Sequence, residues 1–386
     1  MSYQLNEEQE MLHQIVSRMV EDKVAPRASE IDEKDEYPWD LKEIIAEQGL
    51  LGSGIPEEYG GTGAGLPSVC LIVEEIAKAS ASVSLIVAAQ ELGMMPILVG
   101  GSEEQKQKYL PGIADGDQIA AFALTEPNAG SDAGAVKTKA VREGDKYLLS
   151  GQKCFITNGS IADVFTVFAT IDPKAGLKGL SAFIVEKGYP GLTVGKKEHK
   201  MGIRGSETTE IILDNCPVPA ENLMGKEGGG FKIAMMTLDC TRPVIGAQAV
   251  GIAQGALDHA INYAKQRIQF NKPIAAFQGI QFMLADMATR IEAARQLVYK
   301  AAFTIENAKQ NNVSAAEVSR LSSMCKLFAS DVAMQVTVDA VQILGGYGYM
   351  KEYPVERMMR DAKITQIYEG TNQIQRVVIA KNILDN

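Results

Sequence analysis

A single carboxylate near the C-terminus is the strongest candidate for chemistry in this sequence. Glu369 lies between Tyr368 and Gly370 in the segment IYEGTNQIQR, residues 367–376. Apolar neighbours raise the pKa of a carboxyl group by desolvation, and a glycine lets the main chain approach a ligand closely. A glutamate tuned in this way can remove a proton near neutral pH. The alternative is a glutamate that caps a turn at a helix end.

A second segment, LTEPNAGSD at residues 124–132, has the composition of a phosphate-binding turn. It follows an alternating apolar run at residues 118–123, which predicts a strand that ends before Pro127. The main-chain N–H of Gly130 and the hydroxyl group of Ser131 are donors of the kind that bind a pyrophosphate. Short Gly/Asn/Ser segments are more often plain turns, so this segment alone leaves both interpretations open.

The spacing of apolar residues, which indicates the secondary structure that must position these residues, changes twice along the chain. Apolar residues at helical spacing predict helices within residues 6–115, including segments at about 38–50, 67–80, 82–99 and 102–110. Alternating patterns then predict strands within residues 118–215, in the segments AAFAL, KYLLSG, DVFTVFATI, LSAFIVEK and TTEIILDN. Long helices return from residue 228, where residues 277–298 carry one apolar stripe.

The length and composition support a protein of several folded units. A chain of 386 residues with 46% hydrophobic content can bury two or three separate cores. The order of predicted elements indicates an α+β protein. We predict an N-terminal all-α domain at 1–117, a middle β domain at 118–227 and a C-terminal all-α domain at 228–386.

The charge and the sparse cysteine and histidine content argue against several functions. A net charge of −10 disfavours a nucleic-acid surface. Five scattered cysteines without CxxC spacing and three isolated histidines predict neither a disulfide scaffold nor a metal site. The start MSYQLNEEQEML is acidic, unlike a secretion signal, and no uninterrupted apolar stretch reaches membrane-spanning length. We therefore predict a cytoplasmic protein without a membrane span.

Motifs distributed in order along the chain resemble those of the acyl-CoA dehydrogenases, the flavoproteins that desaturate acyl-CoA thioesters. They are LTEPNAGSD (124–132), GQKCFITNG (151–159), MGIRGSETTE (201–210), LDCTRP (238–243), KQRIQF (265–270), QILGGYGY (342–349), MRDAKI (359–364) and IYEGTNQIQR (367–376). The resemblance covers nearly the whole length. It implies the acyl-CoA dehydrogenase fold, in which the C-terminal α domain is of a four-helix type.

The resemblance implies that FAD lies between the β domain and the C-terminal helices. Phe155, where many members carry Trp, would pack on the isoalloxazine ring, and Thr157 would hydrogen-bond near its N5 atom. The other implied FAD contacts are Leu124, Thr125, Ser131, Thr371 and Gln373, with Arg267, Phe270, Gln342 and Gly346 reaching the cofactor from a neighbouring subunit of a homotetramer. Asn271 departs from the usual glycine, but asparagine tolerates a positive φ better than most residues.

The resemblance also implies an acyl-CoA site and a mechanism. The substrate contacts would come from Leu238, Asp239, Arg242, Tyr368 and Gly370. Glu369 would remove the α-proton while the β-hydrogen leaves as hydride to flavin N5. The main-chain N–H of Glu369 and a ribityl hydroxyl of FAD would polarise the thioester carbonyl. An electron-transferring flavoprotein would then accept the electrons.

Two comparisons within the family narrow the type of substrate. Isovaleryl-type and long-chain members carry their catalytic glutamate at the position of Thr241 and have no acid at the position of Glu369, so this chain resembles the short- and medium-chain type. Glutaryl-CoA dehydrogenases carry an arginine near Val83. This chain has no cation between Lys78 and Lys106, which disfavours that substrate.

Glu91 is unusual for the family, which has a small or hydroxyl residue in this part of the acyl-pocket floor. An unpaired buried carboxylate costs several kcal/mol, so a pocket-facing Glu91 would suit a short, cyclic or polar acyl group rather than an alkyl tail. One branch, which acts on cyclohexane- or cyclohexene-carboxyl-CoA, uses a second acid in this region for 1,4-elimination. Glu91 is thus a candidate second acid/base. The alternative is an exposed glutamate, or one paired with the main chain.

Two other functions on the same fold are alternatives to a dehydrogenase. An acyl-CoA oxidase would pass electrons to oxygen, but oxidases are longer chains. A non-catalytic member would bind nucleic acid or a partner, but the sequence pI of about 5.1 and the intact Glu369 argue against it.

Overall fold

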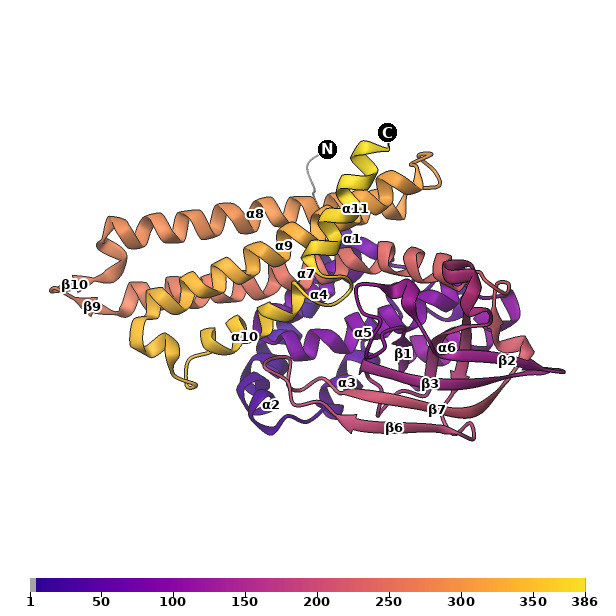
Figure 1. Ribbon diagram of the computed structural model, residues 1–386. Helices are drawn as coiled ribbons and strands as arrows, with labels where there is room; N and C mark the ends of the chain where they lie inside the picture. Colours follow the sequence, from indigo (N-terminus) through magenta and orange to yellow (C-terminus); the bar gives the residue numbers. More distant parts are fainter. Residues whose placement is uncertain (1–4, 386) are drawn as a thin grey trace.

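The computed structural model describes residues 5–385 and has the predicted order of helices, sheet and long helices (Figure 1). The N-terminal helices are α1 (Glu7–Met19), α2 (Ala28–Lys34), α3 (Trp39–Glu47), α4 (Gly65–Ala79), α5 (Ala81–Gly100) and α6 (Glu103–Ala114). The C-terminal helices are α7 (Gly230–Gln266), α8 (Gln278–Glu306), α9 (Ala315–Leu344), α10 (Val355–Thr365) and α11 (Asn372–Leu384). Shorter π or 3-10 turns are η1 (Val20–Val24), η2 (Ala25–Arg27), η3 (Leu50–Gly52), η4 (Glu57–Tyr59), η5 (Ala133–Ala135), η6 (Pro173–Gly179), η7 (Ala220–Asn222), η8 (Ile274–Ala276) and η9 (Gly345–Tyr349).

The middle part of the chain forms one eight-stranded mixed sheet. Its strands are β1 (Ala120–Ala123), β2 (Lys139–Glu143), β3 (Lys146–Thr157), β4 (Val164–Thr170), β5 (Leu180–Glu186), β6 (Leu192–Lys197), β7 (Thr208–Pro219) and β8 (Leu223–Met224). The path runs β6-β7-β3-β2-β4-β5-β8, and β1 pairs in parallel with β4. The five predicted strand segments fall in β1, β3, β4, β5 and β7. The pattern missed β2 and β6, whose residues are exposed or half-buried except for Ala140, and also the two-residue strand β8.

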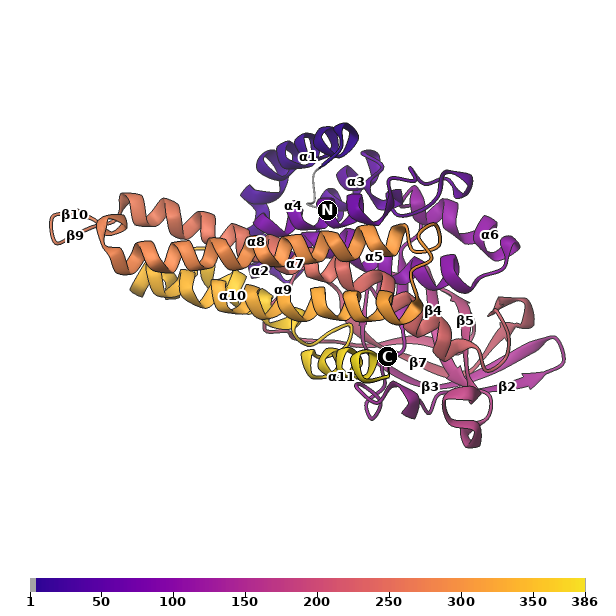
Figure 2. The same cartoon turned by 90° about the horizontal axis from the view of Figure 1, so that it is seen from above.

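The C-terminal helices form a long arm that projects from the rest of the molecule (Figures 1 and 2). Helices α7 and α8 meet at its tip through the short hairpin of β9 (Ile268–Gln269) and β10 (Lys272–Pro273). Phe270 and Asn271 form the hairpin turn, with φ angles of 51° and 63°. The sequence predicted this tolerance of positive φ at Asn271.

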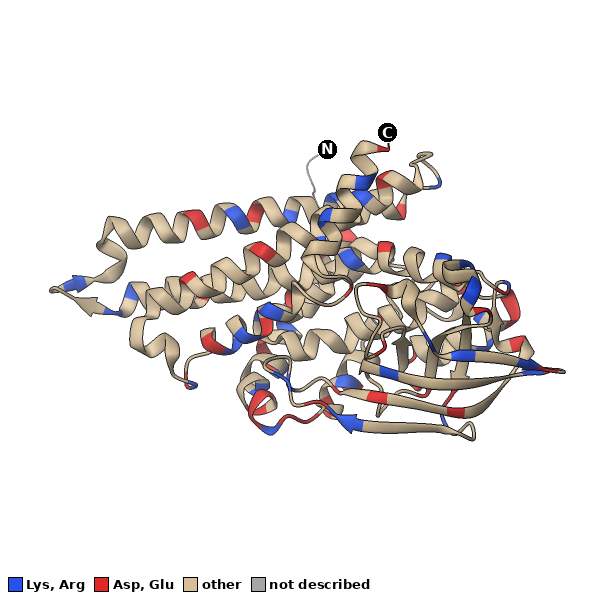
Figure 3. Cartoon of the chain, viewed as in Figure 1, with Lys and Arg blue, Asp and Glu red and all other residues tan. Residues whose placement is uncertain are grey.

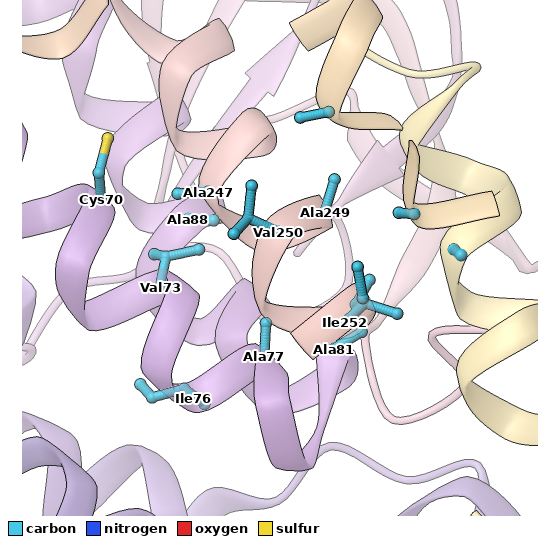
Figure 4. Close-up of a cluster of buried hydrophobic side chains, with 14 of the residues drawn as sticks. Cys70, Val73, Ile76, Ala77, Ala81, Ala88, Ala247, Ala249, Val250 and Ile252 are labelled. Carbon is cyan, nitrogen blue, oxygen red and sulfur yellow. The ribbon is translucent and has the colours of Figure 1, made fainter. Parts of the chain in front are cut away.

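Helices α4 and α7 cross unusually closely in the core between the N- and C-terminal domains. Alanine and small β-branched residues of both helices interdigitate there (Figure 4). A Cβ atom added to Gly251 would lie 2.2 Å from the carbonyl oxygen of Glu74, and one added to Gly255 would lie 2.1 Å from that of Lys78. The main chains of the two helices are therefore in direct contact, which only glycine permits.

Among residues 5–385, two helices are long and apolar enough to span a membrane by length and composition alone, which is weak evidence for a membrane span. One is α5, and the other runs through α9 and η9 over Ala315–Tyr349. For α5, 78% of the apolar window is buried inside the fold. Nearly all of α5 is packed against α4, α7 and β1, which explains its composition as that of a core helix.

Acidic and basic residues are interspersed along the helices and strands (Figure 3). One ion-pair cluster links the two helical domains. Arg360 of α10 donates to Asp32 of α2 at 2.6 Å and to Glu356 of α10 at 2.8 Å. These side chains are mostly buried, so their geometry fixes α10 against the N-terminal helices.

Candidate active site

A cavity of about 440 Å³ lies between the sheet, α5, α7 and the turn that joins α10 to α11. Most of the predicted FAD and acyl-CoA residues meet in its wall. They are Leu124, Thr125, Ser131, Phe155, Thr157, Leu238, Arg242, Tyr368, Glu369 and Gly370. Segments separated by more than a hundred residues in the chain thus build one site.

The sheet side of the cavity depends on an irregularity in β3. The pairing of β3 with β7 changes register between Lys153 and Ile156, and Phe155 adopts a φ of 58° at that point. Such a bulge redirects a side chain out of the sheet. Phe155 is consequently 64% exposed and presents its ring to the cavity.

A buried ion pair supports the neighbouring cavity residues Leu124 and Thr125. Lys153, which is fully buried, donates to the carbonyl oxygen of Leu124 at 3.1 Å and to Glu126 at 2.8 Å. The N–H of Cys154 donates to the carbonyl oxygen of Thr125 at 3.0 Å. Strand β3 therefore fixes the segment after β1, through a Lys153–Glu126 pair that was not predicted from the sequence.

The opposite wall is the turn between α10 and α11. Glu369 and Gly370 both have positive φ, at 51° and 92°. The side chain of Gln375 donates to the carbonyl oxygens of Glu369 at 3.1 Å and Gly370 at 2.9 Å, while Arg242 Nε donates to that of Glu369 at 3.3 Å. Thr371 caps α11 by accepting from the N–H of Ile374. The strained turn is held from several sides.

The carboxylate of Glu369 lies in an environment suited to a base. Thr241 Oγ1 donates to Glu369 Oε2 at 2.8 Å. Desolvation raises the pKa of Glu369 to about 7, against the opposing effects of the Thr241 hydrogen bond and the cations Arg242 and Lys326. At neutral pH the group exchanges a proton readily, as a general base must. The capping alternative is not what the structure shows, because Thr371 supplies that cap.

Several predicted site residues lie outside this cavity. Asp239 instead pairs with Arg242 at 2.9 Å, and Gln373 is exposed on α11. Arg267 and Gly346 line a different cavity, of about 480 Å³, near the tip of the arm. Phe270, which is 87% exposed, and Gln342 also lie on this arm. Within one chain the two groups of predicted FAD residues are therefore apart.

Glu91 lines neither of these cavities. It is 4% exposed and faces a third space of about 540 Å³, which Gly54, Cys240 and Glu306 also line. Burial, and then the charge of Glu306, raise the pKa of Glu91 to about 8. Its neighbours Ala88, Ala89 and Leu92 line the active-site cavity on the other face of α5. Glu91 is thus buried, which the exposed alternative did not foresee, yet its carboxyl group is directed away from the predicted pocket.

Family descriptions match almost the whole chain. The N-terminal domain of the acyl-CoA dehydrogenases matches residues 6–117, the middle domain residues 121–216 and the C-terminal domain residues 228–384. The chain belongs to the acyl-CoA dehydrogenase family. It is therefore an oxidoreductase with the three-domain architecture that its sequence predicted.

Individual relatives agree with this assignment. An acyl-CoA dehydrogenase of Bacillus subtilis is 53% identical and matches over 98% of this chain and 99% of its own. A cyclohex-1-ene-1-carbonyl-CoA dehydrogenase of Geobacter metallireducens is 52% identical over the same shares. The butyryl-CoA dehydrogenase structure from Megasphaera elsdenii is 48% identical and superposes over the whole length of both chains with a TM-score of 0.95.

The cofactor of the family is FAD, and the residues of this site fit it. An acyl-CoA dehydrogenase structure from Bacillus anthracis complexed with FAD has a TM-score of 0.91 and 39% identity, covering 99% of this chain and 68% of that one. Here the exposed ring of Phe155 offers an apolar plane, and Thr125, Ser131 and Thr157 supply hydroxyl groups around it. A Cβ atom at Gly130 would meet nothing within 4 Å, which leaves room for a ligand there.

Some residues of the site escaped the sequence analysis. Thr241 was considered only as the place where other members carry an acid, yet its hydroxyl group contacts the Glu369 carboxylate directly. Gln375 and Lys326 were not considered, although both bind the turn that carries Glu369. Lys326 did leave a signal, because it is a cation on the buried stripe of α9 between Ser322 and Ser330.

Proposed function

We propose that this chain is an FAD-dependent dehydrogenase that introduces an α,β double bond into a short, medium or cyclic acyl-CoA, with Glu369 as the base. The observation that carries the proposal is that Glu369 lines the same largely apolar cavity as Phe155 and Thr157. Leu85, Ala88, Ala89 and Leu92 of α5 supply an apolar surface for an acyl group.

The chain's own groups account for the proton transfer. An α C–H of a thioester is a very weak acid, so the developing negative charge on the carbonyl oxygen needs hydrogen bonds. The main-chain N–H of Glu369 is fixed by the clamped turn and is a suitable donor. The carboxylate takes the proton, while Arg242 and Lys326 keep the ionised form accessible in spite of burial. When bound, FAD supplies the acceptor for the β-hydrogen, which leaves as hydride.

We also propose the assembly and the partners from the family resemblance. Arg267, Phe270, Gln342 and Gly346 serve a neighbour's cofactor in a homotetramer, which accounts for the exposure of Phe270 at the tip of the arm. Thr371 and Gln373 extend the FAD site, and Asp239 positions Arg242 for the CoA group. An electron-transferring flavoprotein is the electron acceptor, and the enzyme acts in the cytoplasm.

A second candidate is 1,4-elimination on a cyclohexene-carboxyl-CoA, with Glu91 as a second acid/base. The relative from Geobacter metallireducens that carries this substrate in its name favours it. The direction of the Glu91 carboxyl group does not, because it faces the space beside Gly54 and Cys240. Glu91 would have to change rotamer to reach the acyl pocket.

The decisive experiment is bleaching of the flavin absorbance by a panel of acyl-CoAs. The panel runs from butyryl through octanoyl to cyclohexanecarboxyl and cyclohexenecarboxyl thioesters. A dehydrogenase is bleached anaerobically by at least one of them, and the ranking identifies the acyl group. A flavoprotein that no member of the panel bleaches would refute the proposal. Rapid reoxidation in air would indicate an oxidase instead.

Replacement of Glu369 tests the base directly. Glu369→Gln keeps the size of the side chain and should retain FAD and acyl-CoA binding. Loss of a general base slows the chemical step by about 100- to 10,000-fold, and we expect flavin reduction to slow at least that much. Stopped-flow absorbance measures the rate, with binding followed by the spectral change on adding acyl-CoA. Retention of fast reduction would exclude Glu369 as the base.

A further inference from the structure

Lys326, in the middle of α9, is a buried cation whose only role in the proposed mechanism so far is its electrostatic effect on Glu369. Its side chain has no exposed surface. Among the described residues it forms no ion pair within 4.0 Å and donates instead to neutral acceptors, Gly370 O at 2.8 Å and Asn372 Oδ1 at 3.0 Å. A buried ammonium group without a paired carboxylate is expensive, so a purely structural role explains it poorly.

The hydrogen bonds of Lys326 place it against the turn that carries the base. Gly370 O, which accepts from Lys326, also accepts from Gln375, and the preceding carbonyl oxygen of Glu369 accepts from Gln375 and Arg242. Glu369 and Gly370 have left-handed main-chain angles that require support. Lys326 is the support that comes from α9, whereas Arg242 comes from α7 and Gln375 from α11.

The charges around Glu369 come from two helices. Helix α7 contributes Arg242 with its partner Asp239, and α9 contributes Lys326 together with Asp331, while Tyr368 precedes the base in its own turn. Burial lowers the pKa of Lys326 to about 7, and the negative charge of Glu369 acts in the opposite direction. The charge on each group therefore favours the charge on the other.

We propose that Lys326 is a positioning residue for Glu369: its ammonium group anchors the Gly370 carbonyl and holds the adjacent carboxylate in the ionised form that accepts the α-proton. This inference rests on the proposed function of Glu369 and adds a residue to it. This role explains why a lysine is buried here: the positive charge of Lys326 and the negative charge of Glu369 stabilise each other, so the loss of one favours the loss of the other.

Two variants separate anchoring from charge. Lys326→Met removes both, while Lys326→Gln removes the charge but keeps an N–H donor for Gly370 O. Ser330→Ala is the matched control, because Ser330 lies one turn later on the same buried face and its hydroxyl group contacts Asn372 rather than the Glu369–Gly370 turn. Each holoenzyme is reduced by the best acyl-CoA of the panel over a range of pH, with rates normalised to flavin content.

The proposal predicts a distinct profile for each variant. In Lys326→Met, reduction near neutral pH slows about 100-fold, the size of effect that misplacement of a catalytic group produces. The midpoint of its pH–rate profile moves up by about one pH unit, because an opposite charge near a carboxylate has been lost. Lys326→Gln recovers most of the rate at high pH but keeps the raised midpoint. Wild-type midpoints in both variants, or the same shift in Ser330→Ala, would overturn the proposal.

A second measurement does not depend on turnover. Thermal unfolding of Lys326→Met, Glu369→Gln and the double variant forms a cycle, in which directly interacting groups give non-additive changes. We expect the double variant to lose less stability than the two single losses added together. Additive losses would refute the coupling. If no acyl-CoA bleaches the wild-type flavin, the proposed function fails, yet this cycle still decides whether Lys326 and Glu369 interact.

Discussion

Thr241 and Glu369 occupy the two positions at which the family resemblance places the base, and here their side chains are in contact. The hydroxyl group of Thr241 donates to the carboxylate at 2.8 Å. One position holds the acid and the other holds a donor that stabilises its ionised form and lowers its pKa. The two positions, one on α7 and one in the turn between α10 and α11, therefore act as a pair in this chain.

Removal of this donor should change the pH dependence of the enzyme. Thr241→Val keeps the shape of the side chain and removes a hydrogen bond to a charged group, which contributes about 1.5–3 kcal/mol. The pKa of Glu369 should rise, so flavin reduction should slow about tenfold at low pH and approach the wild-type rate at high pH. The control is Thr237→Val one turn earlier, where the buried hydroxyl has no hydrogen-bond partner among the described residues. Equal profiles for both variants would contradict this role.

Glu91 should make the protein less stable as the pH rises. Burial raises the pKa of its carboxyl group from 4.5 to about 8, so the folded chain holds this proton more tightly than the unfolded chain does. The stability associated with the bound proton is complete below a pH of about 4.5 and is lost as the pH rises toward about 8. Glu91→Gln should therefore melt above the wild type at alkaline pH, with the difference closing in acid.

Melting temperatures over a pH series measure this effect. Glu57→Gln is a suitable control, because Glu57 borders the same space but is exposed. An identical pH dependence in wild type and Glu91→Gln would show that the carboxyl group is solvated in solution. A rate change on cyclic substrates in Glu91→Gln would instead favour the 1,4-elimination alternative.

Among the secondary-structure elements, strands with buried apolar side chains were predicted from the sequence, whereas strands with mostly exposed side chains were missed. Strands β4 and β5 are almost wholly buried, and their apolar runs were recognised. Strands β2 and β6 have mostly exposed side chains, so nothing in their composition distinguishes them from loops; hydrogen bonds to β3 and β7 define them instead.

The site residues also divide into those that could be predicted from the sequence and those that could not. Motif resemblance found the residues that face the cavity, such as Phe155 and Glu369. It did not find the bulge that aims Phe155 or the positive φ of Glu369, because both depend on pairing and packing rather than on residue type. Lys326 and Lys153 were missed because a lone lysine in a sequence is usually a surface charge; burial is a property of the fold. The predicted domain boundaries stay a prediction.

At the scale of the whole molecule, the arm separates the predicted FAD residues into two groups. Arg267 lies at its tip with its guanidinium carbon 5.3 Å from the ring centroid of Tyr347, in a cavity that shares no residue with the active site. Arg267 can contact FAD only if another subunit places its own cofactor at the tip of this arm. The homotetramer proposed here supplies that arrangement.

Arg267→Ala should therefore lower flavin content and loosen the assembly together. The guanidinium group would no longer neutralise a neighbour's diphosphate, and ligand binding and assembly are linked by mass action. The flavin-to-protein absorbance ratio and size-exclusion chromatography measure the two effects. Lys265→Ala, an exposed cation two residues earlier, is the control. Full flavin content with an unchanged oligomer would reduce Arg267 to a surface charge.

The contact between α4 and α7 has a consequence for how this protein tolerates genetic change. Every amino acid other than glycine carries a Cβ atom, and at Gly251 and Gly255 that atom would fall about 2 Å from a carbonyl oxygen of the opposite helix. No amino-acid substitution at Gly251 or Gly255 therefore fits without displacing one of the two helices. Helix α7 also carries Leu238, Thr241 and Arg242. A substitution at Gly251 or Gly255 that displaces α7 would therefore reduce activity, although no residue of the active site is changed.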